Sequence, residues 1–109
     1  MKRKYHKAST RTTKKEVYNM MHRLHKEIKN NQLISFKRMR GIQGEYDYSD
    51  DAITLDYRRE LIPTLIHEFI HKWHPEKCER WVLQKERHIV NNLTCAQAKN
   101  LIKFLALVI

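Results

Sequence analysis

One stretch of the sequence decides the fold: LIPTLIHEFIHKWHP, residues 61–75. Its apolar residues recur every three or four positions, as at Ile62 and Ile66, which is typical of a helix with one buried face. Pro63 fits because it falls in the first turn, where a backbone N–H has no partner inside the helix. The helix should end before Pro75, since the residue preceding a proline is pushed out of the helical region.

The polar side of this helix carries His67 and His71, and Glu68 follows the first of them, giving the order H-E-x-x-H. Four residues make just over one helical turn, so both imidazoles leave the same face and can bind one Zn²⁺ ion. The carboxylate of Glu68 is then placed to take a proton from a water molecule that the metal activates. The alternative interpretation is a solvated, histidine-rich helix face.

A catalytic zinc site needs a third protein ligand, and the segment after the turn offers several. A second apolar-periodic segment runs from Glu76 to about Asn91. If it folds back antiparallel about Pro75, a metal between the two histidines lies within reach of Glu79, whereas Glu86 lies about 7 Å further along the axis. Glu79 is therefore the expected third ligand. The alternatives are Glu86, Glu76, His74, Cys78 and His88.

The motif and the residues after it resemble a known family. Residues 66–71, then 74–75 and 78–82, are similar to the pattern of small gluzincin-type metallopeptidases called minigluzincins, and of related SprT-like proteins. In that pattern a short turn with Pro precedes a helix that opens with Ser-Glu-x-x-Val, and here Cys78 stands in place of the Ser. The resemblance covers roughly residues 33–105. It implies a zincin-like fold, zinc as cofactor, Glu79 as third ligand and Glu68 as catalytic base.

The expected function is therefore zinc-dependent hydrolysis of peptide bonds in a peptide or protein substrate. The substrate backbone should pair with an edge strand, and a further donor should stabilise the developing oxyanion. The alternative is a basic, nucleic-acid-associated binding protein with the same fold and weak or no catalysis. Glu68 favours the enzyme, because a purely structural zinc site does not need it. The candidate oxyanion donors are Tyr46, Tyr48, Tyr57 and His88.

The remaining elements predict an α+β fold. Capping boxes at residues 13–16 and 94–97 predict helices over about 14–29 and 95–107. Strands are expected at 32–37, 41–48 and 52–56, with Gly44 as a possible bulge. The element order α-β-β-β-α-α-α then suggests a small antiparallel three-stranded sheet with helices packed on one side, in a single zincin-like domain over residues 14–109.

Charge is concentrated in the first third of the chain. Residues 1–40 carry 13 Lys and Arg against two Glu, a net of +11, whereas residues 41–109 carry nine Lys and Arg against ten Asp and Glu, a net of −1. We expect residues 1–13 to form a flexible basic tail. The basic third predicts contact with nucleic acid through counterion release, and the alternative is a solubilising role.

Composition limits the remaining possibilities. A length of 109 residues fits one small domain. Cys78 and Cys95 are too few for a disulfide scaffold. No apolar run is long enough to span a membrane, and the basic residues 1–4 are not followed by the apolar segment of a secretory signal. We therefore expect a cytoplasmic protein with no membrane contact.

Overall fold

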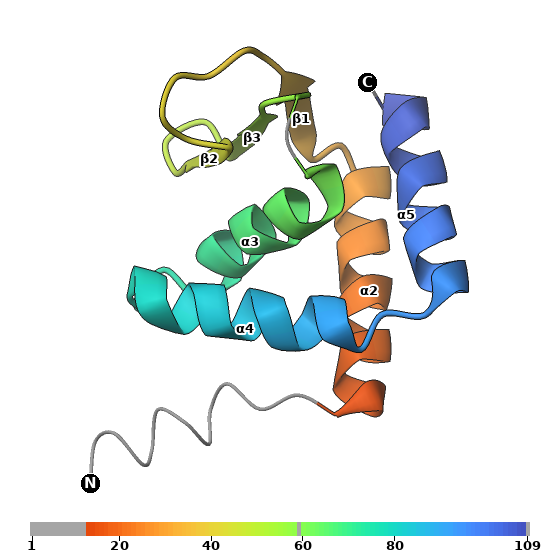
Figure 1. The fold of residues 1–109 in the computed structure, drawn as a ribbon. Helices are drawn as coiled ribbons and strands as arrows, with labels where there is room; N and C mark the ends of the chain where they lie inside the picture. Colours follow the sequence, from red (N-terminus) through yellow and green to blue (C-terminus); the bar gives the residue numbers. More distant parts are fainter. Residues whose placement is uncertain (1–12, 59, 109) are drawn as a thin grey trace, which may run out of the picture.

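The computed structural model describes residues 13–58 and 60–108. The elements follow the predicted order and form an α+β fold (Figure 1). They are α2 (Lys14–Lys29), β1 (Leu33–Phe36), β2 (Gly44–Asp47), β3 (Ala52–Leu55), α3 (Leu61–Trp73), α4 (Glu79–Asn91) and α5 (Cys95–Val108). No helix within these ranges is long and apolar enough to cross a membrane.

Both predicted capping boxes are confirmed. At α2 the Glu16 amide donates to the Thr13 hydroxyl (3.2 Å) and the Thr13 amide donates to the Glu16 carboxylate (3.0 Å). Thr94 and Gln97 make the same pair of hydrogen bonds before α5. Thr13 is thus the N-cap of α2 and belongs to the folded part. The rest of the predicted tail, residues 1–12, lies outside the described residues.

The second helix of the metal motif begins later than predicted, at Glu79 and not at Glu76. His74 ends α3, with its amide bonded to the Ile70 carbonyl (2.8 Å), and the Lys77 amide then closes a turn onto the His74 carbonyl (3.1 Å). Residues 75–78 therefore form the turn that reverses the chain direction. This turn places Glu79 in the first turn of α4.

The predicted antiparallel sheet is wrong in one pairing. The strand order is β1-β3-β2: β2 pairs antiparallel with β3, but β1 pairs parallel with β3. Residues 37–43 carry the chain from one edge of the sheet to the other. The buried carboxylate of Asp56 fastens this crossing, because it accepts hydrogen bonds from the Met39 amide (3.1 Å) and the Arg58 guanidinium (2.8 Å). In the order β1-β3-β2, strand β2 lies at an edge of the sheet.

Gly44 is not a bulge, since the β2–β3 register runs without interruption from Gly44 opposite Leu55 to Asp47 opposite Ala52. Gly44 instead allows strand β2 to approach helix α3 closely. A Cβ atom at this position would lie 2.6 Å from the Thr64 methyl carbon on α3. The absence of a side chain at Gly44 thus allows the edge strand to lie directly beside the helix that carries the H-E-x-x-H motif.

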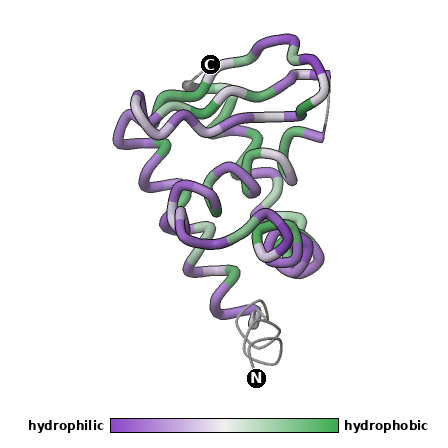
Figure 2. Tube along the Cα trace, turned by 90° about the vertical axis from the view of Figure 1, so that its left-hand side faces the viewer, coloured by the Kyte–Doolittle hydropathy of each residue, from purple (hydrophilic) through white to green (hydrophobic). Residues whose placement is uncertain are grey.

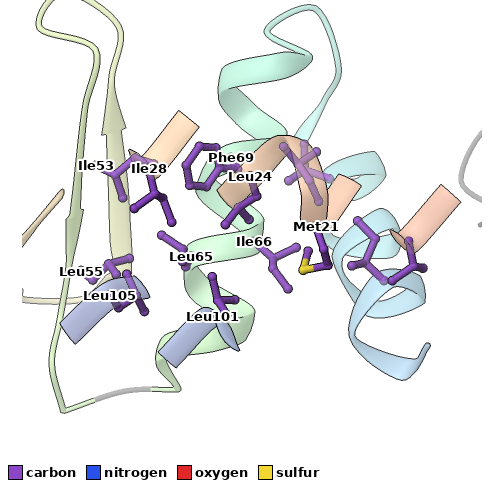
Figure 3. Packing of buried hydrophobic residues seen from close by; sticks show 14 of the residues in the cluster. Met21, Leu24, Ile28, Ile53, Leu55, Leu65, Ile66, Phe69, Leu101 and Leu105 are labelled. Atoms are coloured by element: carbon purple, nitrogen blue, oxygen red, sulfur yellow. The ribbon is translucent and has the colours of Figure 1, made fainter. Parts of the chain in front are cut away.

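Buried residues of the four helices and β3 form one core, part of which Figure 3 shows, and Ile34 of β1 and Tyr46 of β2 pack against it. Leu65, Ile66 and Phe69 of α3 are buried among residues of α2, β3 and α5, which accounts for the apolar periodicity of the motif helix. Hydrophobic and hydrophilic segments alternate along α2 in Figure 2, as expected of a helix with one buried face. The histidines therefore project from a helix whose other face is fixed by packing.

A polar network that sequence reasoning missed also holds α3 in place. Lys72 pairs with Glu27 of α2 (2.7 Å) and with Asp51 in the β2–β3 turn (3.2 Å), and Trp73 donates its indole N–H to Glu27 (2.7 Å). These partners lie 21 to 46 residues apart in the chain. No local pattern could reveal them, because each member alone looks like an ordinary surface residue.

The environment of His25 indicates that the free energy of unfolding depends on pH. Burial lowers the pKa of His25, and the charge of His22 adds to this effect. Its ring packs at a tilt against Phe104, and its buried Nε2 atom has no hydrogen-bond partner within the described residues. Because the folded pKa lies below the unfolded value, the unfolded state binds more protons in acid, so this histidine lowers the free energy of unfolding as pH falls through about 6.5.

We therefore expect His25→Leu to flatten the loss of stability between about pH 7.5 and pH 5, by at most about 1.4 kcal/mol per pH unit for one proton. Urea unfolding of both proteins across this range measures the difference. His22→Gln, an exposed change one turn away, should keep most of the wild-type slope. Parallel pH curves for wild type and His25→Leu would show that His25 is not coupled to folding.

Candidate metal centre

Two consecutive helices bring the predicted ligands together. In Figure 1, α4 lies beneath α3 and is joined to it by the short turn of residues 74–78. His67 and His71 leave α3 on the side that faces α4, and Glu79 approaches from the first turn of α4. The ligand atoms of these three side chains lie within 4.8 Å of one another.

The distances inside this group are short. The two Nε2 atoms of His67 and His71 are 3.2 Å apart. One carboxylate oxygen of Glu79 lies 2.8 Å from His71 Nε2, and the other lies 3.1 Å from His67 Nε2. Neighbouring ligands of a tetrahedral zinc ion with bonds of about 2.0–2.1 Å are separated by roughly 3.3 Å. Two neutral imidazoles and one carboxylate, at this spacing, are a donor set that fits Zn²⁺.

Glu86 contacts the site from a different direction. Its carboxylate lies 2.8 Å from Nδ1 of His67, the ring nitrogen that faces away from Glu79. The sequence placed Glu86 about 7 Å further along the axis and kept it as an alternative ligand, but its carboxylate is not part of the group formed by His67, His71 and Glu79. Burial lowers the pKa of His67, but the Glu86 hydrogen bond and the Glu79 charge outweigh it, so the pKa is raised overall. Glu86 thereby holds Nδ1 protonated and leaves Nε2 to face His71 and Glu79.

Glu68 lies next to the ligand group and is almost completely buried, with 6% of its surface exposed. Its carboxylate makes no hydrogen bond to any residue that the structure describes. Burial is the main cause that raises the pKa of Glu68, against the lowering effect of His67, and the charges of Glu79 and Glu45 add to the rise, which reaches about 7. A carboxyl group with a pKa near 7 can both accept and return a proton.

An open cleft of about 840 Å³ runs past this group. Residues 41–46 and Tyr48 form one wall, α3 contributes Thr64, His67, Glu68 and His71, and the turn and α4 complete the lining. Residues 44–46 of edge strand β2 therefore border the cleft. The side chains from the turn and α4 are Pro75, Lys77, Glu79, Leu83 and Glu86.

Two of the four predicted oxyanion donors line the cleft. The Tyr48 hydroxyl, on a half-exposed ring, donates to the His71 carbonyl (3.1 Å), and the Tyr46 hydroxyl donates to Asp51 (2.7 Å). Burial, together with Asp51, raises the pKa of Tyr46 to about 12. Tyr57 and His88 do not line the cleft. Tyr48 is the freer of the two remaining donors, since its only described hydrogen bond is to a backbone carbonyl and not to a carboxylate.

The other alternative ligands lie outside the group. The His74 ring packs edge-on against Trp81 (5.1 Å), and its nearest carboxylate is Glu76 (3.9 Å). Cys78 is an exposed, free cysteine at the N-cap of α4. None of these side chains, nor that of His88, is within the cluster formed by His67, His71 and Glu79.

Comparison with known protein families, with characterised proteins and with solved structures gave no match. The geometry of the site is therefore the main basis for a functional assignment.

Proposed function

We propose that the chain is a zinc-dependent metallopeptidase. The observation that carries the proposal is the convergence of His67, His71 and Glu79 beside the buried carboxylate of Glu68, at the side of an open cleft. A zinc ion bound there would supply Lewis-acid chemistry, polarising the scissile carbonyl and lowering the pKa of water. The resemblance to minigluzincins points to the same ligands and the same base.

In this mechanism the protein's own groups position the substrate and move one proton. The free edge of β2 offers backbone N–H and C=O groups, so an extended peptide can add as a further strand along the cleft. Glu68 accepts the proton of the attacking water and returns it to the leaving amine. The Tyr48 hydroxyl, released from the His71 carbonyl, is the candidate donor to the developing oxyanion.

The test is a metal add-back assay. The purified chain, loaded with one equivalent of Zn²⁺, should cleave members of a random peptide library. Treatment with EDTA should abolish cleavage, and added Zn²⁺ should restore it. Mass spectrometry of the products identifies the cleaved bonds. A zinc-loaded, folded protein that cleaves no peptide or protein substrate would contradict the enzyme assignment.

Glu86 provides a prediction specific to this site. Removing a carboxylate that orients a metal-binding histidine typically weakens metal affinity 10–100-fold. We expect that loss in Glu86→Ala, and a smaller loss in Glu86→Gln, because an amide oxygen still accepts the Nδ1–H bond of His67. Competition with a chromophoric chelator measures the affinity.

The matched control for this series is Gln84→Ala, an exposed change on the same helix. It should leave zinc affinity unchanged. Wild-type affinity in Glu86→Ala would show that Glu86 does not orient His67. Complete loss of zinc in that variant would instead make Glu86 a direct ligand.

A second candidate function, nucleic-acid binding, is favoured by the exposed side of α2. Lys14, Lys15, Lys26 and Lys29 are exposed there and form no ion pair with any described side chain. The two acidic residues of the helix are engaged elsewhere, Glu16 in the capping box and Glu27 with Lys72 and Trp73. The Tyr18 ring is 62% exposed on this helix, and an exposed aromatic ring can stack on an unpaired base.

We therefore propose weak, sequence-independent binding of nucleic acid along this face. Replacing the four lysines with Gln should weaken binding of a fluorescent single-stranded oligonucleotide. It should also make the slope of log K against log salt shallower by about 2 to 3, at about 0.7 per lost phosphate contact. The charge-matched control replaces Arg80, Arg87, Lys99 and Lys103, all exposed on α4 and α5. Equal binding by the two variants would refute the proposal that nucleic acid binds to this face of α2. If the wild type does not bind at low salt, the basic residues serve solubility and not nucleic-acid binding.

A further inference from the structure

We propose that the cleft selects cationic peptides, with Lys or Arg side chains on either side of the cleaved bond. This inference rests on the proposed peptidase function and names its substrate class. Five of the chain's twelve acidic residues line this one cleft. They are Glu45, Glu60, Glu68, Glu79 and Glu86.

One cationic side chain, Lys77, faces these carboxylates in the lining. Its ammonium group lies 5.1 Å from the centroid of the Trp81 ring on α4, so part of its charge interacts with that ring and not with the carboxylates. With neutral histidines, the four carboxylates other than Glu68 and one ammonium group give the lining a formal charge of −3. A Zn²⁺ ion would still leave −1, and Glu68 adds to this negative charge when it is ionised. The cleft thus stays negative when the metal site is filled.

The carboxylates are distributed around the whole cleft. Glu45 lies on edge strand β2, Glu60 lies at the N-cap of α3, and Glu86 lies on α4. A peptide paired with β2 therefore passes between negative side chains on both walls. Neither Glu45 nor Glu60 forms an ion pair with a described side chain, so both charges are available to a ligand.

A second observation points to a ligand in this cleft and not to a merely solvated acidic surface. Glu68 lines the cleft with only 6% of its surface exposed, and it has no hydrogen-bond partner within the described residues. Its carboxylate oxygens are not fully enclosed, since His25 Nε2 is the only fully enclosed polar side-chain atom without a partner among the described residues, so their free hydrogen-bonding positions are open to the cleft. Its placement therefore indicates that the cleft is built to receive polar groups from outside.

The rest of the molecule strengthens this selectivity. The chain's formal net charge of +10 comes from residues 1–40, which carry +11, so a cationic peptide is repelled from that basic third and not from the cleft. A negative cleft inside a positive protein focuses the attractive field at a single place. An acidic peptide would instead be drawn to the basic surface and repelled from the cleft. Charge therefore favours binding of cationic peptides in the cleft over binding of acidic peptides there.

The experiment measures binding separately from cleavage. Zinc-loaded Glu68→Gln protein is titrated with three fluorescent peptide pools of equal length, enriched in Lys and Arg, in Gln, or in Asp and Glu. We expect the cationic pool to bind at least about tenfold more tightly than the neutral pool at low salt, with the difference shrinking as salt screens the charges. Adding Glu45→Gln and Glu60→Gln should reduce that preference to less than about threefold, with little change for the neutral pool.

The control adds Asp50→Asn and Glu76→Gln, two exposed acidic residues outside the cleft, and should keep the full preference. Equal binding of all three pools, no binding of any pool, or an unchanged preference after the Glu45 and Glu60 changes would overturn the inference. Cleavage by the wild type is scored in parallel. Cleavage without charge preference refutes this inference alone, whereas charge-selective binding without cleavage refutes the peptidase proposal alone.

Discussion

Glu68→Gln is expected to retain zinc and to lower the turnover of a peptide substrate by at least about a hundredfold. Gln has nearly the same shape as Glu but cannot accept a proton from water. Glu68 is not among the three side chains whose ligand atoms converge, so the metal should remain. Turnover close to wild type in a zinc-loaded Glu68→Gln protein would place the catalytic base elsewhere.

The fold should not suffer from this change. Glu68 is buried and makes no hydrogen bond that the substitution would break within the described residues. Its pKa is raised to about 7, mainly because burial disfavours the charged form. A neutral amide at that position avoids the cost of a buried charge above pH 7, so we expect equal or higher resistance to thermal unfolding. Glu76→Gln, outside the cleft, is the control for both activity and stability.

His67→Ala is expected to abolish stoichiometric zinc binding, which is the largest effect on the metal. It removes one of three ligands and also the partner of Glu86, so only His71 and Glu79 would remain to hold the metal. Elemental analysis after dialysis should show about one zinc per wild-type molecule and almost none in the variant. His74→Ala, which changes a histidine of the same helix end outside the cluster, should retain zinc.

Zinc should also stabilise the wild type and not the variant. A ligand at a free concentration of a hundred times its Kd raises the free energy of unfolding by about 2.7 kcal/mol. We expect that increase in wild type and its absence in His67→Ala. Equal zinc content, or equal stabilisation by zinc, in the two proteins would rule out His67 as a ligand.

The parts of the fold that follow local rules could be predicted from the sequence. Both capping boxes set helix starts, because their hydrogen bonds join residues three apart. The pairing of His67 with His71 follows from helix periodicity alone. Predicting the position of Glu79 required only that the chain reverses its direction at Pro75. These predictions depend on few degrees of freedom, so the structure brings the same side chains together.

The parts that depend on distant contacts could not be predicted. The partial alternation at residues 32–37 predicts a strand, but not whether that strand runs parallel to its neighbour. The contact between Glu86 and His67 could not be predicted from distance along the helix axis, because it depends on the reach of the two side chains. The acidic lining of the cleft was also missed, since Glu45 and Glu60 come from separate elements that only the tertiary fold brings together.

Diffraction from crystals of the zinc-loaded chain, recorded at the zinc absorption edge, tests the metal site most directly. We predict a single anomalous peak about 2.0–2.2 Å from Nε2 of His67, Nε2 of His71 and a carboxylate oxygen of Glu79, with Glu86 bonded to Nδ1 of His67 and not to the metal. No peak at this position, or a Glu79 carboxylate more than about 4 Å from the zinc, would contradict the account.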